Sequence, residues 1–233
     1  MKALGEPISD KALKLLPYPV IGSPKIDGIR AVCDGKKVLS STLKPIGNKH
    51  IQSCLSHSIY EGLDGELAVG KPHTDFNDDP DDDVFHRTSG PVRRSDGKPD
   101  FKYYVFDDWT EPNTSYQYRW LDQYDDLLTA EMPHVVILEY KVLNNPQEVL
   151  DYEEWCVNLG YEGCMLRIPS SPYKEGRTTF KEMYAFKRKP IVDDEAEIVG
   201  FFEQMENNNE QITDAMGLSR RSAHKENKTG KGT

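Results

Sequence analysis

What the 233-residue sequence lacks excludes several classes of protein. The longest unbroken aliphatic run, residues 135–138, is far shorter than the ~20 residues that span a bilayer. Residues 1–9 contain no apolar signal-peptide core. The four cysteines form no Cys-x2-Cys pair, so we expect neither a zinc site nor a disulfide framework. These absences predict a cytoplasmic protein with no membrane partner.

Positive charge is also scarce, because the formal net charge is −10. Taken as a sum, this charge opposes nucleic-acid binding, but its distribution along the chain matters more. Residues 75–83 hold six aspartates, whereas residues 170–190 hold six Lys/Arg against two Glu, and residues 213–233 hold five Lys/Arg against two acidic residues. A basic surface can therefore exist on this acidic protein. The aspartate run lacks EF-hand spacing, which favours a solvated loop over a calcium site.

The first half of the chain is predicted to form strands separated by turns. Strands are expected at residues 20–22, 29–33 and 37–42, with a type I′ hairpin turn at Asp34-Gly35. The alternation in residues 63–69 predicts a strand with Asp64 and Glu66 on one face. Residues 101–107 form a further, aromatic-rich strand.

The second half contains two predicted helices. One covers residues 114–132 on its apolar spacing. The other begins with Asn145 as N-cap, Pro146 at the first helical position and Glu148 two positions later, and ends at Gly160. Strands are expected at residues 135–143, 164–168 and 183–189, the last with Lys187 and Lys189 on one face.

Residues 190–194 are predicted to be a domain boundary. Beyond them we expect one strand at residues 195–202 and then a polar stretch to Thr233. A segment of ~40 residues is too short to bury its own core. We therefore interpret residues 190–233 as the beginning of a second domain whose remainder is absent from this chain.

Five short motifs follow one another along the sequence, and their order and spacing are more specific than any one of them. They are Lys25-Ile26-Asp27-Gly28-Ile29-Arg30, Leu63-Asp64-Gly65-Glu66-Leu67, Tyr103-Tyr104-Val105-Phe106-Asp107, Glu162-Gly163-Cys164-Met165-Leu166-Arg167 and Phe186-Lys187-Arg188-Lys189. Together they resemble motifs I, III, IIIa, IV and V of the covalent nucleotidyltransferases, and among these the ATP-dependent DNA ligases. The resemblance covers residues 17 to 231, and residues 217–225 are similar to the early OB-fold segment of compact viral and phage ligases.

This resemblance implies an α+β fold. Residues 1–189 would form an ATP-grasp-like nucleotidyltransferase domain of antiparallel sheets with flanking helices, and residues 190–233 the start of an OB-fold β-barrel. No extra DNA-binding domain precedes Lys25, as in the minimal ligases. The implied protein is a monomer, cytoplasmic or phage-encoded, that seals nicked duplex DNA with ATP and Mg²⁺.

The implied chemistry begins with Lys25, which attacks the α-phosphorus of ATP and must be neutral to do so. Nearby cations or desolvation can make a lysine neutral, and Lys187 and Lys189 are suitable neighbours that also bind the α-phosphate by resemblance. The resemblance assigns the remaining roles around the nucleotide: ribose to Glu66, adenine stacking to Phe106, metal to Glu162 and Asp27, and further nucleotide contacts to Ser23, Pro24 and Arg30.

The predicted DNA contacts include one departure from the family. Members usually carry Ser-Arg-Asn or Ser-Arg-Thr after the hairpin, whereas this chain has Ser40-Ser41-Thr42. Serine in place of a phosphate-binding arginine affects nick recognition more than self-adenylation. The predicted nucleic-acid contacts are Ser41, Lys44, Lys174, Arg177, Arg220, Arg221, Lys225 and Lys228.

Two alternatives to a DNA ligase remain open. One is an RNA ligase or an mRNA-capping guanylyltransferase, which would use the same lysine chemistry. Arg30 after Asp-Gly and the Glu-Gly-x-Met-x-Arg form of residues 162–167 favour the DNA ligase. The other is a nick-binding module without catalysis, motivated by Ser41 and the short C-terminal part.

Overall fold

The computed structural model describes residues 1–75, 83–123, 132–190, 199–200, 205–213, 219–221 and 228–230. The chain divides into two units, Met1–Pro190 and Ile191–Thr233, and each is considered by itself. Among the described residues no helix has the length and apolar character to cross a bilayer. The predicted acidic loop falls mainly on residues 76–82, which lie outside this description.

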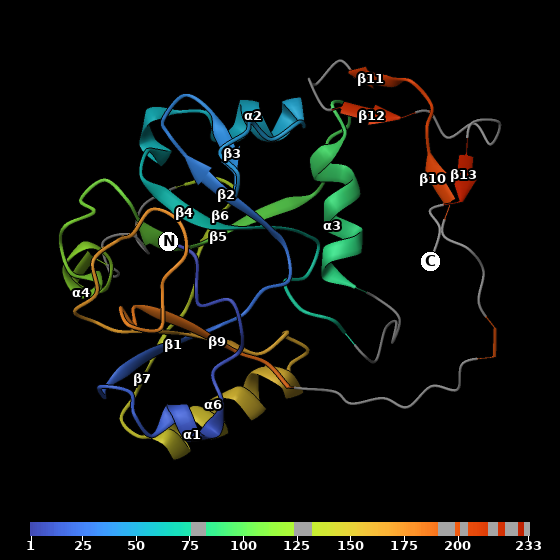
Figure 1. Ribbon diagram of the computed structural model, residues 1–233. Coiled ribbons are helices and arrows are strands. Elements are labelled where there is room, and N and C mark those ends of the chain that lie inside the picture. The colour runs from blue at the N-terminus through green and yellow to red at the C-terminus, as the bar shows by residue number, and fades with distance from the viewer. Residues whose placement is uncertain are drawn as a thin grey trace. The chain divides into compact units, whose positions relative to one another are not determined.

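The first unit contains a five-stranded sheet with strand order β3-β2-β4-β5-β6 (Figure 1). Its strands are β2 (Ile29–Cys33), β3 (Val38–Ser40), β4 (Leu63–Val69), β5 (Phe101–Asp108) and β6 (Val135–Ile137). All neighbours are antiparallel except β5 and β6, which are parallel. The prediction of antiparallel sheets is therefore wrong at this edge. The long connection from β5 to β6 gives the chain room for the crossover that a parallel pair requires.

A second, four-stranded antiparallel sheet has the order β7-β1-β8-β9. It is formed by β1 (Val20–Pro24), β7 (Lys141–Leu143), β8 (Cys164–Arg167) and β9 (Ala185–Arg188). The single strand predicted for residues 135–143 is wrong, because β6 lies in the five-stranded sheet and β7 in this one. Residues 138–140 carry the chain from one sheet to the other.

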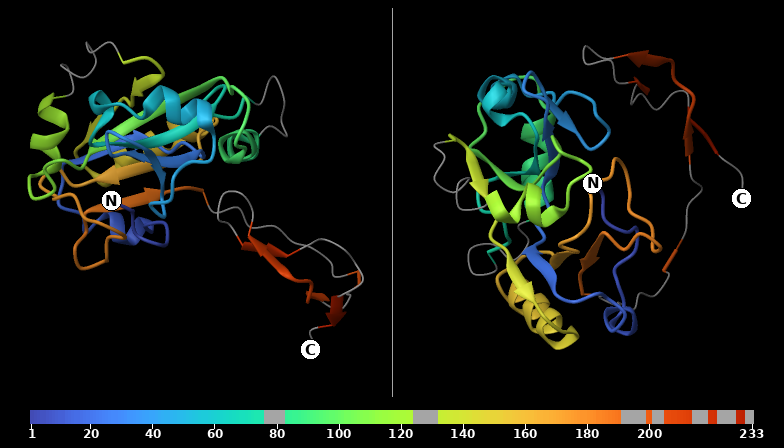
Figure 2. Two further views of the ribbon diagram at one scale, coloured as in Figure 1. Left: turned by 90° about the horizontal axis from the view of Figure 1, so that it is seen from above. Right: turned by 90° about the vertical axis from the view of Figure 1, so that its left-hand side faces the viewer.

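Each sheet has its own helices and its own core. Helices α2 (Lys49–Leu55) and α3 (Val84–Arg93) contact the five-stranded sheet. Helices α1 (Asp10–Leu13) and α6 (Pro146–Asn158) contribute to the core of the four-stranded sheet, on the face opposite the other sheet (Figure 1), and Figure 2 shows the same layers from two further sides. The α+β class is thus confirmed.

The start of α6 is as predicted. The Asn145 side chain accepts a hydrogen bond from the Glu148 amide at 3.0 Å, and the Glu148 carboxylate accepts one from Asn145 Nδ2 at 2.7 Å. Gly160 follows the helix with φ of 85°. The helix predicted for residues 114–132 is instead interrupted: α4 covers Tyr116–Arg119, a 3-10 turn follows at Leu121–Gln123, and residues 124–131 lie outside the description.

The turn between β2 and β3 differs from the predicted type I′ turn. Of the turn residues only Gly35 has positive φ, at 76°. The Asp34 amide donates to the Lys37 carbonyl at 3.1 Å, so Gly35 and Lys36 are the central residues. A type I′ turn needs positive φ at both central residues, so the predicted turn type is wrong. The Asp34 carboxylate then accepts the amides of Lys36 and Lys37.

The second unit is described as two short antiparallel pairs. Strand β10 (Met205–Asn207) pairs with β13 (Lys228–Gly230), and β11 (Gln211–Thr213) pairs with β12 (Ser219–Arg221). The strand predicted for residues 195–202 lies almost wholly outside the described residues. The OB-fold assignment stays a prediction.

Candidate active site

The loop that carries Lys25 joins the two sheets. Strand β1 ends at Pro24 in the four-stranded sheet, and β2 begins at Ile29 in the other. The loop backbone is fixed by two hydrogen bonds to the start of β8: the Lys25 amide donates to the Gly163 carbonyl at 2.9 Å, and the Glu162 amide donates to the Lys25 carbonyl at 3.2 Å. These bonds place Lys25 and Glu162 side by side.

Two motif glycines permit close backbone packing around this loop. A Cβ on Gly28 would come within 2.2 Å of the Leu67 carbonyl oxygen, so only glycine lets the loop lie against β4. Gly163 has φ of 139°, and a Cβ there would come within 2.1 Å of the Arg188 carbonyl oxygen. The two glycines therefore bring β4 and β9 to the nucleophile loop.

A pocket of about 200 Å³ opens between the sheets beside Lys25. From the four-stranded sheet it is lined by Ser23 and Pro24 of β1, Met165 and Arg167 of β8, and Lys187 of β9. Register explains this grouping, since Met165 lies opposite both Ser23 and Lys187 in the sheet. The sheet thus presents an amine, a guanidinium and a hydroxyl to one cavity.

From the five-stranded sheet the pocket is lined by Arg30 of β2, Glu66 of β4 and Phe106 of β5. Arg30 and Glu66 are directly opposite each other in the β2–β4 register. Burial raises the pKa of Glu66 to about 8, although Lys25 and Arg30 oppose this shift. Glu66 is therefore largely protonated at neutral pH and can donate as well as accept a hydrogen bond.

Lys25, Glu162 and Lys189 form one charged cluster. Lys25 Nζ donates to Glu162 Oε2, and Lys189 Nζ donates to Oε1 of the same carboxylate at 3.2 Å. Burial acts to raise the pKa of Glu162, but the hydrogen bonds and charges of Lys25 and Lys189 outweigh it and hold the pKa below its usual value. An amine in an ion pair is an ammonium with no lone pair to attack with, so this contact must open before Lys25 reacts.

Asp27 lies beside this cluster and also lines the pocket. Burial and the neighbouring charge of Glu162 raise the pKa of Asp27. Two carboxylates that repel each other beside a pocket lined by cationic side chains fit Mg²⁺, which is usually held by one or two carboxylates together with substrate phosphates. No cluster of three or more metal-ligating side chains occurs within the described part of the chain.

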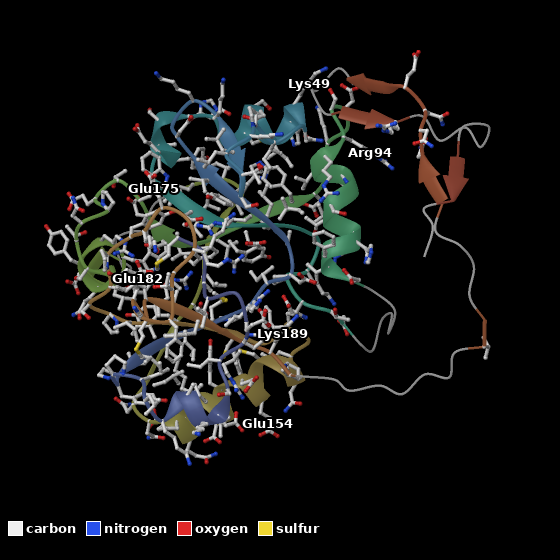
Figure 3. All side chains as sticks on the ribbon, viewed as in Figure 1. Lys49, Arg94, Glu154, Glu175, Glu182 and Lys189 are labelled. Atoms are coloured by element: carbon white, nitrogen blue, oxygen red, sulfur yellow. The ribbon has the colours of Figure 1, made fainter. Side chains whose placement is uncertain are left out.

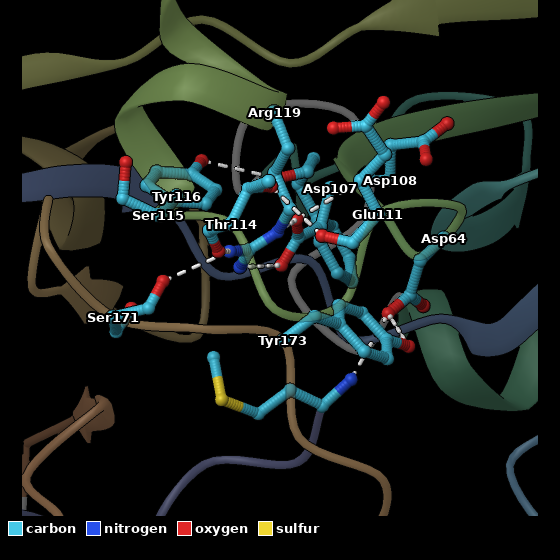
Figure 4. Close-up of polar contacts among 12 residues, drawn as sticks. Asp64, Asp107, Asp108, Glu111, Thr114, Ser115, Tyr116, Arg119, Ser171 and Tyr173 are labelled. Carbon is cyan, nitrogen blue, oxygen red and sulfur yellow. Dashed lines mark hydrogen bonds and ion pairs between the residues drawn. The ribbon is translucent and has the colours of Figure 1, made fainter.

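Arg30 is held in place by Asp64, a residue that the sequence reasoning assigned only to a strand face. Arg30 Nε donates to Asp64 Oδ1 at 2.9 Å. The Tyr173 hydroxyl donates to Asp64 Oδ2 at 2.8 Å (Figure 4). Asp64 is fully buried. This network raises the pKa of Arg30 further despite its own burial, which acts in the opposite direction.

Comparison with solved structures identifies the fold. The chain is similar to the DNA ligase-adenylate of Chlorella virus, with 32% sequence identity, a TM-score of 0.65, and coverage of 81% of this chain and 67% of the viral chain. The chain belongs to the ATP-dependent DNA ligase family. The expected resemblance is thereby confirmed.

More distant ligases share the fold. A Lig E DNA ligase is 19% identical, with a TM-score of 0.66, and the match covers 100% of this chain and 84% of that one. The ATP-dependent DNA ligase of bacteriophage T7, solved in complex with ATP, is 18% identical, with a TM-score of 0.56 over 94% of this chain and 74% of the phage chain. No family model and no curated protein matches the sequence of this ligase.

The predicted DNA contacts of the ligase are scattered in the structure. Ser41 lies in a second cavity of about 600 Å³ that Arg30 also lines, whereas Lys44 is exposed on the same loop and does not line it. Arg177 lines the first pocket and donates to the Ala3 carbonyl at 3.1 Å. Lys174 is tied to Glu182 by two 2.7 Å hydrogen bonds, so its charge is already paired. Figure 3 labels Glu182 among the side chains of the first unit.

The C-terminal candidates can be placed only in part. Arg221 is exposed in β12 and donates to the Asn209 carbonyl at 3.0 Å. The side chains of Arg220 and Lys228 are not among those described, and Lys225 lies outside the described residues. Their contact with DNA remains a prediction.

Besides Asp64, the pocket or support residues that the sequence did not predict include Met165, Arg167 and Tyr173. The first two belong to the recognised motif around Glu162 and alternate on β8, so the period of the strand could have placed both on the pocket side. Tyr173 lies in the long connection between β8 and β9, and no sequence signal links it to Asp64.

Proposed function

We propose that this chain seals nicks in duplex DNA, using ATP and a covalent lysyl-AMP intermediate. The observation that carries the proposal is the position of Lys25. It lies at the junction of two sheets, beside a pocket whose walls offer four cationic side chains, two carboxyl groups and the ring of Phe106. The similarity to a DNA ligase-adenylate supports the same reaction.

The first step is nucleophilic attack of Lys25 Nζ on the α-phosphorus of ATP. The ammonium first loses a proton to solvent; the N–P bond then forms as the bond to the bridging oxygen breaks, pyrophosphate leaves with that electron pair, and the nitrogen loses a second proton to give the phosphoramidate. Lys187, on the pocket wall, stabilises the negative charge that grows on the α-phosphate. Glu66 binds the ribose, and Phe106 stacks on the base. The step needs positioning and charge stabilisation more than any further covalent chemistry.

Glu162 and Asp27 would hold a Mg²⁺ ion against the phosphates. A bound Mg²⁺ supplies charge neutralisation of the triphosphate. Because Glu162 is engaged by both Lys25 and Lys189, any group that takes over its carboxylate also releases the Lys25 amine. Glu162 thus couples occupation of the site to exposure of the nucleophile.

The two later steps use the nick. The 5′-phosphate attacks the phosphorus of lysyl-AMP, which restores Lys25, and the 3′-hydroxyl then attacks the 5′-phosphorus and expels AMP. Ser41 and Arg177 are proposed to approach the nick phosphate, and the C-terminal cations to grip the duplex by counterion release. The proposed enzyme is monomeric and cytoplasmic or phage-encoded.

Intact mass spectrometry with ATP and Mg²⁺ tests this proposal. A gain of one AMP, reversed by pyrophosphate and lost from Lys25→Arg, is the expected result. Transfer of the AMP to nicked DNA and formation of a sealed strand complete the test. Labelling by GTP alone would favour the guanylyltransferase, and sealing of RNA alone would favour an RNA ligase. Nick binding with no adenylate would favour a module without catalysis.

A further inference from the structure

Arg167 is a buried cation that makes one long hydrogen bond among the described residues. Its residue is 5% exposed. Its Nε has no hydrogen-bond partner, and its Nη1 makes one long contact, 3.4 Å to Ser23 Oγ. No carboxylate lies within ion-pair distance of it in the described part of the chain. Buried donors without acceptors are costly, so a native fold retains them where a ligand supplies the acceptor.

A second buried arginine shows how this fold satisfies a guanidinium when no ligand is needed. Arg119, 3% exposed, donates to both oxygens of Asp107 at 2.9 and 3.3 Å, and to the carbonyls of Thr114 and Ser171 at 2.8 Å each (Figure 4). Both arginines pack on Tyr116, with guanidinium carbons 5.4 and 5.5 Å from its ring centroid. The two differ in partners and not in burial.

The Arg167 guanidinium faces the nucleotide pocket. It lines that cavity together with Ser23 and Phe106, and its central carbon lies 4.6 Å from the Phe106 ring centroid. Lys25 and Lys187 are the amines that suit the phosphates in the same cavity. Arg167 therefore contacts the aromatic ring that suits the base.

We propose that Arg167 is a nucleotide-binding residue that donates a hydrogen bond to an acceptor nitrogen on the edge of the purine base. The inference rests on the proposed function and deepens it. Arginine has donors and no acceptor, so it selects a base edge that carries a lone pair. The ring nitrogens of adenine offer such lone pairs. Ser23 Oγ, which accepts from the same guanidinium, limits how the side chain can turn.

The test compares Arg167→Met with Arg119→Met in the whole chain. Methionine keeps much of the volume and packs against aromatic rings. Without nucleotide, Arg167→Met should melt no lower than the unaltered protein, since it removes an unsatisfied donor, whereas Arg119→Met should melt lower because Asp107 loses its partner. A melting temperature for Arg167→Met that falls as far as that of Arg119→Met would make Arg167 structural and overturn the proposal.

The second part of the test uses nucleotide analogues to find the base nitrogen that Arg167 contacts. In single-turnover adenylation, Arg167→Met should raise the ATP concentration for half-maximal rate about 10-fold, as expected for one lost charge-assisted hydrogen bond. Of 1-deaza-, 3-deaza- and 7-deaza-ATP, one lacks the nitrogen that Arg167 contacts. For the unaltered protein, the half-maximal concentration of that analogue should be about 10-fold higher than that of ATP. For Arg167→Met, that analogue and ATP should have the same half-maximal concentration. The contact would be refuted if the effects of the substitution and of the analogue multiplied in Arg167→Met. It would also be refuted if the unaltered protein used ATP and the three analogues equally well.

These outcomes separate the inference from the proposed function. If the unaltered protein forms no lysyl-AMP, the proposed function fails and the analogues cannot be compared by adenylation rate. In that case AMP binding is measured from the rise in melting temperature, and the difference between the unaltered protein and Arg167→Met decides whether Arg167 contacts the base. Arg167→Lys is the second variant should Arg167→Met not fold. It keeps the charge but loses Nε and the planar fork, so it should bind AMP more weakly than the unaltered protein; equal binding would contradict the proposal.

Discussion

Replacing Glu162 by glutamine tests whether the charge of this side chain serves catalysis more than stability. Glu162→Gln keeps the shape and removes the carboxylate that pairs with Lys25 and Lys189. The side chains of Lys25 and Glu162 are 20% and 24% exposed, so the pair lies between a surface ion pair, worth about 0–1 kcal/mol, and a buried one, whose disruption costs about 3–5 kcal/mol. We expect a loss of about 1–2 kcal/mol in the free energy of unfolding.

The expected loss in rate is larger. Removing an electrostatic group that acts on a phosphoryl-transfer transition state should slow adenylation by a factor on the order of 10², which is about 2.7 kcal/mol. A protein that is stable by the usual ~5–15 kcal/mol stays folded after losing about 1–2 kcal/mol. Slower adenylation by Glu162→Gln could not then be a result of unfolding.

The assay is single-turnover adenylation with labelled ATP, paired with urea unfolding of the same samples. Glu182→Gln is the matched control, because Glu182 also pairs with a lysine, but that lysine is Lys174 and not Lys25. It should adenylate at the normal rate. Normal adenylation by Glu162→Gln, or equal slowing of the two variants, would refute the role given to Glu162.

Three further predictions concern single residues. Lys25→Arg should form no AMP adduct in intact mass spectra while its circular dichroism stays unchanged, because arginine is not deprotonated in proteins; a labelled variant would show another nucleophile. Since the pKa of Glu66 is raised from 4.5 to about 8, its protonated form stabilises the fold at low pH and this contribution is lost as pH rises toward 8. In urea unfolding, the free energy of unfolding of Glu66→Gln should not show that decrease with pH. The same decrease in Glu66→Gln as in the unaltered protein would contradict the raised pKa of Glu66. Ser41→Arg should speed sealing by pre-adenylated enzyme and leave adenylation nearly constant; the reverse pattern would show that Ser41 does not face the nick.

Local patterns in the sequence were sufficient where local chemistry decides the structure. Asn145, Pro146 and Glu148 cap α6 as expected, because all the atoms involved lie within one helical turn. The strand period likewise predicted faces for Glu66 and Lys187, and both side chains line the pocket beside Lys25. Such features depend on few distant contacts.

The failures involve contacts between distant segments. Residues 135–143 are predicted to form one strand, but the chain changes sheets inside this segment, because β6 pairs with β5 and β7 pairs with β1. Whether a buried arginine is satisfied is equally non-local. Arg119 donates to Asp107 and Ser171, 12 and 52 residues away, whereas the hydrogen bond that Arg167 makes among the described residues goes to Ser23. A sequence motif cannot show whether the fold places a hydrogen-bond acceptor next to a buried arginine.

The same reasoning explains why Ser41 should limit sealing and not adenylation. The described cations that line its cavity are Lys2 and Arg30. Arg30 cannot turn toward a phosphate at Ser41 without giving up Asp64, whose fully buried carboxylate would then lose its guanidinium partner. Because Arg30 is committed in this way, the Ser41 hydroxyl and the single charge of Lys2 must do what a charged, bidentate arginine does elsewhere in the family. The defect therefore falls on the step that meets the nick, where Ser41→Arg should relieve it.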